Sequence, residues 1–150
     1  AAKYYSRGAL KVRAELRFHK KIEAEMVQFW HLYETDDMGR LFEGNYLRIH
    51  QLLAQIFVPT WPPHVAFKMA VKDWHHDTKY YSDRMANGRA YLDRVTFCDS
   101  LFELVDLWVD SIEVEDYVNF LREIYKKLTR MMHRHRIVIP HISRAATMNP

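Results

Sequence analysis

An acidic stretch around a single glycine, YETDDMGRLFEGNYL at residues 33–47, holds the side chains best suited to chemistry in this sequence. Calcium binds oxygen ligands, which a twelve-residue loop supplies from positions 1, 3, 5, 7, 9 and 12 with glycine at position 6. With Gly39 at position 6, Leu41 takes position 8, where an apolar residue is expected. The ligand positions then fall on Glu34, Asp36, Met38, Arg40, Phe42 and Asn45.

Most of these side chains are poor calcium ligands. Position 5 offers a soft sulfur, position 9 offers no donor atom, and position 12 has a neutral amide where a bidentate carboxylate is needed. Position 7 has to give only its carbonyl, but its arginine adds a positive charge. Asp36 is the one good side-chain ligand, since the glutamate at position 1 is oversized. We therefore expect Gly39 and Leu41 to preserve the loop, without calcium at physiological concentrations.

Other polar clusters are weaker candidates. In DWHHD, Asp73, His76 and Asp77 share one side of a helix and have the chemistry of transition-metal ligands, but no fourth ligand is evident. We interpret this cluster as a solvated helix end. The two histidines of MMHRHR (131–136) are two residues apart and do not share one helix face, so we interpret this stretch as a basic contact strip and not as a metal site. Cys98 lies in an apolar helix and is interpreted as a packed thiol. Because no catalytic set is present, we do not expect an enzyme.

Helical periodicity of the apolar residues determines the elements that position these groups. The expected helices span residues 7–33, 42–57, 64–80 and 93–108, and a fifth begins after VDSIE (109–113) and runs to about residue 133. The prolines of VPTWPP (58–63) end the second helix, and Asn87-Gly88 predicts a loop before the fourth. Asp93 is a plausible cap, and Asp110 with Glu113 is a variant of the capping box.

The composition indicates one all-α domain. Among 150 residues, 49% are hydrophobic and only four are glycine and five proline. The single cysteine rules out an internal disulfide and favours a reducing compartment. The sequence contains no run of about 18 apolar residues, so we expect no transmembrane helix. We also expect no secretory signal. The chain lacks an initiator methionine, which fits a fragment or a processed product.

Positive charge gathers at both ends of the chain. Residues 1–24 hold seven basic and two acidic side chains, and residues 122–150 hold seven and one, so the middle is acidic at a total charge of +3. Basic ends suit an acidic polymer such as nucleic acid, an anionic membrane or a microtubule wall, although solvated helix faces are an equal alternative. We expect Trp61 to be an interface aromatic. The cations expected to contact a partner are Arg122, Lys126, Lys127, Arg130, Arg134 and Arg136.

Two stretches carry a resemblance to a known family. YETDDMGRLFEGNYLRIHQLL (33–53) and YLDRVTFCDSLFELVDLWVDSIEVEDYVNFLREIY (91–125) resemble the paired EF-hand-like modules of ciliary and flagellar proteins of protists. The resemblance covers roughly residues 16–128 and implies paired EF-hand-like helix–loop–helix units with an additional C-terminal helix. We expect the helical domain to span residues 1–136, followed by an extended arm at 137–150, where helical periodicity is absent and Pro140 interrupts the chain. The resemblance also implies that Leu92 pairs with Leu41 in a short bridge. Met85 and Thr96 would then occupy positions 1 and 12 of a second loop, which departs from the calcium pattern.

The resemblance implies a non-enzymatic structural protein of a ciliary or flagellar microtubule assembly. Its expected partners are tubulin in the microtubule lattice or neighbouring axonemal proteins within a large hetero-assembly in the cytoplasm, with no cofactor, membrane or nucleic acid. Two alternatives stay open. The first is a calcium-binding sensor or buffer, and the second is a structural subunit of another large cytoplasmic or organellar complex, for example one that contains RNA.

Overall fold

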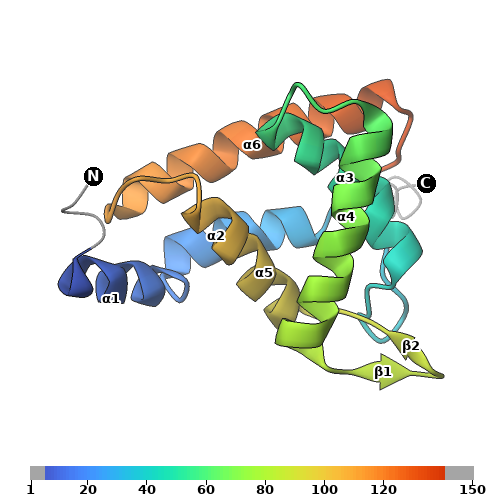
Figure 1. Cartoon of the computed structure of the whole chain (residues 1–150), viewed down its shortest axis with the longest axis horizontal. Coiled ribbons are helices and arrows are strands. Elements are labelled where there is room, and N and C mark those ends of the chain that lie inside the picture. Colours follow the sequence, from blue (N-terminus) through green and yellow to red (C-terminus); the bar gives the residue numbers. More distant parts are fainter. Residues whose placement is uncertain (1–5, 141–150) are drawn as a thin grey trace, which may run out of the picture.

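The structure, a computed structural model, describes residues 6–140 as an all-α fold (Figure 1). Its α-helices are α1 (Arg7–Leu16), α2 (Lys20–Trp30), α3 (Glu43–Phe57), α4 (Pro63–Asp77), α5 (Arg94–Asp106) and α6 (Val114–Arg134). A π-helical turn, η2 (Thr78–Ser82), follows α4, and a small antiparallel hairpin pairs β1 (Met85–Ala86) with β2 (Arg89–Ala90). The predicted all-α class is confirmed.

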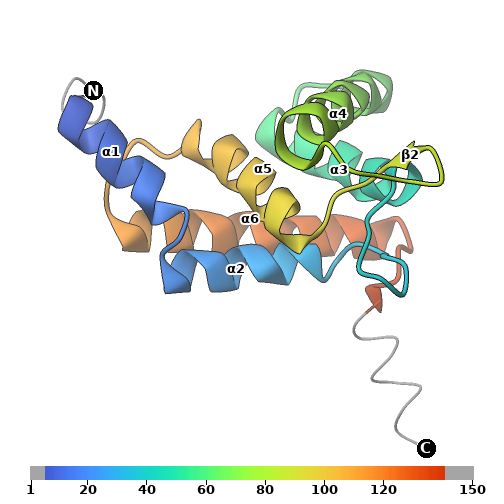
Figure 2. The same ribbon diagram turned by 90° about the horizontal axis from the view of Figure 1, so that it is seen from below.

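α2 to α5 form two helix–loop–helix units, α2–α3 and α4–α5, and α6 packs mainly on the first of them. A loop joins α2 to α3, and the β1–β2 hairpin lies between α4 and α5. α2 packs against α5, while α3 packs against α4, so the two units contact each other through both of their helices. α6 runs along α2 and α3 (Figures 1 and 2). Segments far apart in the sequence thus enclose one core.

α6 contributes an amphipathic stripe to that core. Its buried residues recur every three or four positions and are Tyr117, Val118, Leu121, Ile124, Leu128 and Met132. Beside them, the ring of Tyr125 meets Phe29 of α2 edge-on, with centroids 5.5 Å apart. Burial of a leucine-sized side chain stabilises the fold by roughly 1.5–3 kcal/mol, so this stripe fixes α6 on the domain.

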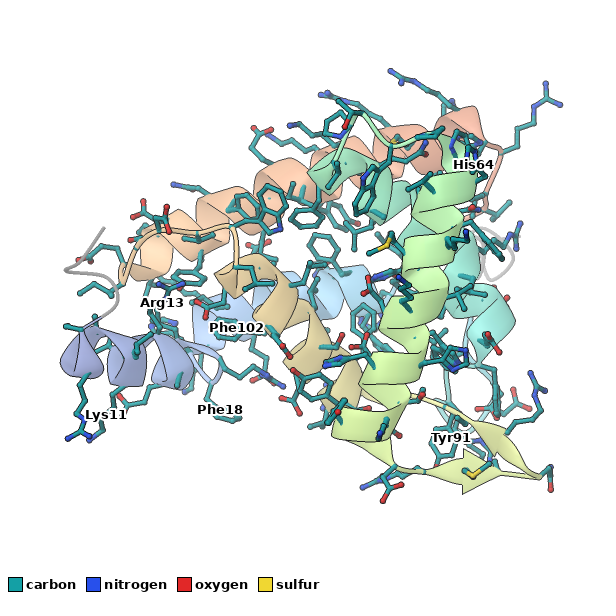
Figure 3. The ribbon with its side chains drawn as sticks, viewed as in Figure 1. Lys11, Arg13, Phe18, His64, Tyr91 and Phe102 are labelled. Carbon is teal, nitrogen blue, oxygen red and sulfur yellow. The ribbon has the colours of Figure 1, made fainter. Side chains whose placement is uncertain are left out.

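The single helix expected over residues 7–33 is wrong, because the chain breaks between α1 and α2. Arg13, labelled in Figure 3, and Arg17 are both at most 6% exposed, and each binds a residue of α5. Arg13 donates from Nε to Asp106 (3.0 Å), and Arg17 donates from Nε to Asp99 (2.7 Å). His19 then caps α2 by accepting from the backbone N–H of Lys21. Because of the break, α1 changes direction, and Arg13 reaches the C-terminal end of α5.

The end of α4 and the cap of α6 also differ from the sequence expectation. α4 ends at Asp77 rather than near residue 80, and its continuation is the π-helical turn η2. Asp110 does not cap α6, whose first residue is Val114. Instead the Ser111 hydroxyl accepts from the backbone N–H of Glu113 and donates to Asp116. The expected cap of α5 is present, since Asp93 and Thr96 bond reciprocally.

Candidate functional site

The loop between α2 and α3 is closed by its own residues. Gly39 has φ of +71°, a left-handed conformation that glycine adopts without steric cost. The Asp36 carboxylate accepts from the backbone N–H groups of Met38 (3.0 Å) and Arg40 (2.9 Å) through Oδ1. These bonds form a tight side-chain turn in which the carboxylate points back into the loop.

Arg40 binds the other oxygen of the same carboxylate. Its Nε donates to Oδ2 of Asp36 at 2.7 Å, and both side chains are 30% exposed. Desolvation raises the pKa of Asp36, but the bonds from the backbone and side chain of Arg40 outweigh it, and the net pKa lies below the ordinary value. The best calcium ligand in the loop is therefore already paired with a tethered cation.

The remaining loop positions do not converge on a cation site. Met38 is 76% exposed and points to solvent. The centroid of the Phe42 ring lies 5.9 Å from that of the Tyr91 ring and 4.4 Å from the guanidinium of Arg89. Glu34 and Asn45 border a small recess next to the segment after α6. Within residues 6–140, no three His, Cys, Asp or Glu side chains are grouped so that they could hold a metal ion.

Leu41 and Leu92 join the two loops. They form an isolated antiparallel bridge with N–H···O distances of 2.8 and 2.9 Å, and both are fully buried. The bridge expected from the sequence is present. Thr96, the expected last ligand position of the second loop, caps α5 instead. The hairpin turns at Asn87-Gly88, whose φ angles of 52° and 75° are those of a tight two-residue turn.

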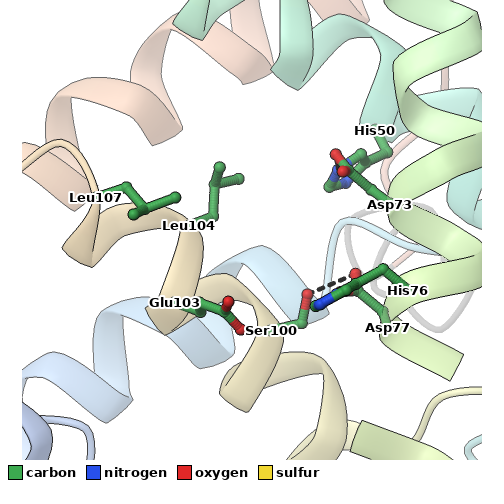
Figure 4. A pocket seen from close by; sticks show the side chains of 8 residues that line it. All are labelled: His50, Asp73, His76, Asp77, Ser100, Glu103, Leu104 and Leu107. Carbon is green, nitrogen blue, oxygen red and sulfur yellow. Dashed lines mark hydrogen bonds and ion pairs between the residues drawn. The ribbon is translucent and has the colours of Figure 1, made fainter. Parts of the chain in front are cut away.

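A pocket of about 200 Å³ opens between α3, α4 and α5 (Figure 4). His50 Nε2 lies 3.1 Å from Asp73 on one side of it. On the other side Asp77 accepts from the hydroxyls of Tyr46 (3.0 Å) and Ser100 (2.5 Å). The lining residues are His50, Asp73, His76, Asp77, Ser100, Glu103, Leu104 and Leu107.

The expectation that Asp77 belongs to a solvated helix end is wrong, since it is only 5% exposed. Tyr46 and Ser100, which hold it, come from α3 and α5 and were missed in the sequence. The spacing of the sequence could have predicted the burial of Asp77, because it continues the buried stripe of Ala70 and Trp74 at helical intervals.

Burial keeps the Tyr46 hydroxyl and the Cys98 thiol in their neutral forms. It raises the pKa of Tyr46 well above its ordinary value, and the Asp77 carboxylate raises it further. The tyrosine hydroxyl therefore remains a donor at neutral pH. Burial also raises the pKa of the Cys98 thiol to about 11, in keeping with the packed thiol expected from the sequence.

The six C-terminal cations are all exposed, but they do not share one environment. Arg122 donates to Glu25 of α2 at 2.8 Å. The other five form no ion pair with a carboxylate of the described residues, and we call them the basic face. They are Lys126, Lys127, Arg130, Arg134 and Arg136.

Part of the basic face borders a recess at the end of α3. This α3–α6 recess, of about 250 Å³, is lined by three apolar residues, Ile56, Pro59 and Met131, which we call its floor. The other three lining residues are the exposed cations Lys127, Arg130 and Arg134, which we call its rim.

Trp61 lies in the proline-rich joint between α3 and α4 and is partly buried. Its backbone N–H donates to the Val58 carbonyl (3.1 Å), and its carbonyl accepts from the Gln55 side chain (3.3 Å). The residue does not line the α3–α6 recess. Its role as a partner anchor stays a prediction.

The first residues of the expected arm lie against the domain. Ile137 and Ile139 are partly buried against the core, and the Ile137 N–H donates to the Met132 carbonyl (2.9 Å). For residues 137–140, the expectation of an arm that is ordered only against a partner is wrong. The rest of the arm, residues 141–150, lies outside the described residues.

The comparisons with known proteins bring no relative. No family model matches the chain, and neither a curated protein nor a solved structure does so. The resemblance to EF-hand-like modules stays a prediction drawn from the two quoted stretches. In the described part of the chain, no helix has the length and apolar character required to span a membrane.

Proposed function

We propose that this chain is a non-enzymatic scaffold protein in which two EF-hand-like units hold a partner protein without calcium. Support for the pairing comes from the bridge between Leu41 and Leu92 and from the packing of α2 on α5 and α3 on α4. We place the scaffold in a ciliary or flagellar microtubule assembly, because the stretches at 33–53 and 91–125 resemble modules of such proteins.

The ion pair between Asp36 and Arg40 is the observation that carries the scaffold role. A calcium ion would have to displace a guanidinium held by the loop itself, at the one carboxylate well placed to bind it. Positions 5, 9 and 12 would add no charge to offset that loss. The pair therefore favours a scaffold over a calcium sensor.

Calorimetry with millimolar calcium tests this choice. The full chain should give no saturable heat of calcium binding. The double variant Arg40→Thr/Asn45→Glu should give such a heat, because Gly39 and Leu41 preserve the shape of the loop. A micromolar dissociation constant for the unaltered chain would contradict the scaffold proposal and favour the sensor.

The basic face is the surface we propose for the partner. Its cations are open to tubulin in the microtubule lattice or to acidic surfaces of neighbouring axonemal proteins. A structural subunit of an RNA-containing complex is the second candidate, because the same unpaired cations suit phosphates.

Microtubule co-sedimentation separates these candidates. The variant Lys126→Glu/Lys127→Glu/Arg130→Glu should lose most binding in a salt-sensitive way. Its matched control, Arg7→Glu/Lys11→Glu/Lys20→Glu, changes the net charge equally on α1 and α2 and should bind normally. Equal loss in both variants would indicate a bulk charge effect, and tighter binding to single-stranded RNA than to microtubules would favour the second candidate.

A further inference from the structure

The α3–α6 recess combines exposed cations with apolar lining residues. Its rim has three cations and no carboxylate, and its floor is aliphatic. The floor is made by the end of α3 (Ile56), the joint (Pro59) and α6 (Met131), so three elements converge to form it. Such a site suits a ligand that is anionic at its edges and apolar at its centre.

Helix stability explains only part of the rim. Cations in the last turn of a helix interact favourably with its dipole, and this effect fades beyond that turn. Arg134 ends α6 and is accounted for in this way. Lys127 and Arg130 lie further from the end, and neither pairs with a carboxylate of residues 6–140. Their charge is available to a partner.

The floor indicates which anionic partner fits. Nucleic-acid strands are commonly held by aromatic rings that stack on bases, and none of the six lining residues is aromatic. The volume of about 250 Å³ is below the range of pockets that enclose whole small ligands, roughly 300–1,000 Å³. One aliphatic side chain within an extended acidic segment is small enough for this volume and needs no aromatic ring to stack on.

We infer that the α3–α6 recess binds a short acidic peptide segment of a partner protein, with one leucine-sized side chain on the floor. Carboxylates on either side of that side chain pair with Lys127, Arg130 and Arg134, as charge complementarity across an interface requires. The inference deepens the proposed scaffold function and rests on it.

Fluorescence anisotropy with the full chain tests the inference. The probes are labelled Glu-Glu-Leu-Glu-Glu and Glu-Glu-Gly-Glu-Glu, which differ only in the apolar side chain. The leucine peptide should bind at least about fivefold more tightly, because only it buries apolar area. Lys127→Glu/Arg130→Glu should weaken its binding about tenfold, and the control Lys11→Glu/Lys20→Glu should leave it within about twofold.

Two further measurements keep the outcomes separate. Pro59→Glu, at an exposed position of the floor, should remove the preference for leucine while circular dichroism stays unchanged. Equal binding of the two peptides, or tighter binding of an oligouridine through the same cations, would overturn the inference. If the leucine peptide binds as expected but microtubules do not co-sediment with the chain, the recess stands and the microtubule assignment fails.

Discussion

Arg40 and Arg130 lie on the same domain, but among residues 6–140 only Arg40 has a carboxylate partner. Arg40 closes the loop onto Asp36 at 2.7 Å, while Arg130 is exposed at the rim of the α3–α6 recess. In the loop, the charge of Arg40 stabilises a turn, whereas on α6 the charge of Arg130 is exposed to solvent. The difference indicates that the residues most like a metal site serve the structure, and it agrees with the recognition role that we propose for the surface of α6.

The largest expected effect is that of Leu41→Asp. Leu41 is fully buried in the bridge to Leu92, so an aspartate there would leave a buried charge without a partner. We expect a loss of roughly 3–5 kcal/mol in the free energy of unfolding, measured by urea denaturation. Met38→Asp, at the 76% exposed position of the same loop, should change stability by at most about 0.5 kcal/mol. Similar values for both would contradict a structural role for the bridge.

A paired and an open arginine should respond differently to replacement by methionine. Arg17→Met removes the bond to Asp99, and because Asp99 is partly exposed we expect a loss of about 2 kcal/mol, below the value for a fully buried pair. Arg130→Met should leave stability within about 0.5 kcal/mol. Thermal and urea unfolding of the two variants measure this contrast. Equal losses of unfolding free energy in both variants would contradict it.

Trp61→Ala tests whether the joint belongs to the recognition surface. As an anchor, Trp61 should contribute about 2 kcal/mol to microtubule binding, the usual value for an aromatic hot spot. Co-sedimentation and urea unfolding are compared for the same variant. If stability falls while binding is unchanged, Trp61 belongs to the core.

The smallest expected effect is a shift in acid sensitivity from Arg40→Met. The pKa of Asp36 is lowered in the folded protein, so its stabilising contribution is complete above the unfolded value of about 3.9 and is lost as the pH falls through the folded pKa. Without Arg40 the pKa should rise and acid unfolding should begin at higher pH. An NMR titration of the carboxyl measures the shift, with Arg48→Met as control. An unchanged pKa would show that the backbone bonds alone lower it.

Local signals in the sequence predicted several elements well. Proline at the start of α4, the reciprocal bonds of Asp93 and Thr96, and the turn at Gly39 depend on residues that are neighbours in the chain. The pairing of Leu41 with Leu92 was also predicted, because both leucines hold equivalent places in their loops.

The features that were missed depend on distant partners. The break after α1 exists because Arg13 and Arg17 bond to α5, 93 and 82 residues away. Asp77 is buried because Tyr46 and Ser100 donate to it from other helices. The recess likewise needs α3, the joint and α6 together, so helical periodicity predicted the cations but not the floor between them.

The position of α6 across α2 and α3 has a consequence for biosynthesis. α2 leaves the ribosome before most of the domain exists, and its partner helix begins only at Val114. At ordinary elongation rates, the intervening segment takes on the order of ten seconds to synthesise. During that interval Phe29 and its neighbours have no cover from α6, and contacts of such long sequence separation also slow folding. Truncation before α6 should therefore yield a nascent chain that aggregates or binds chaperones.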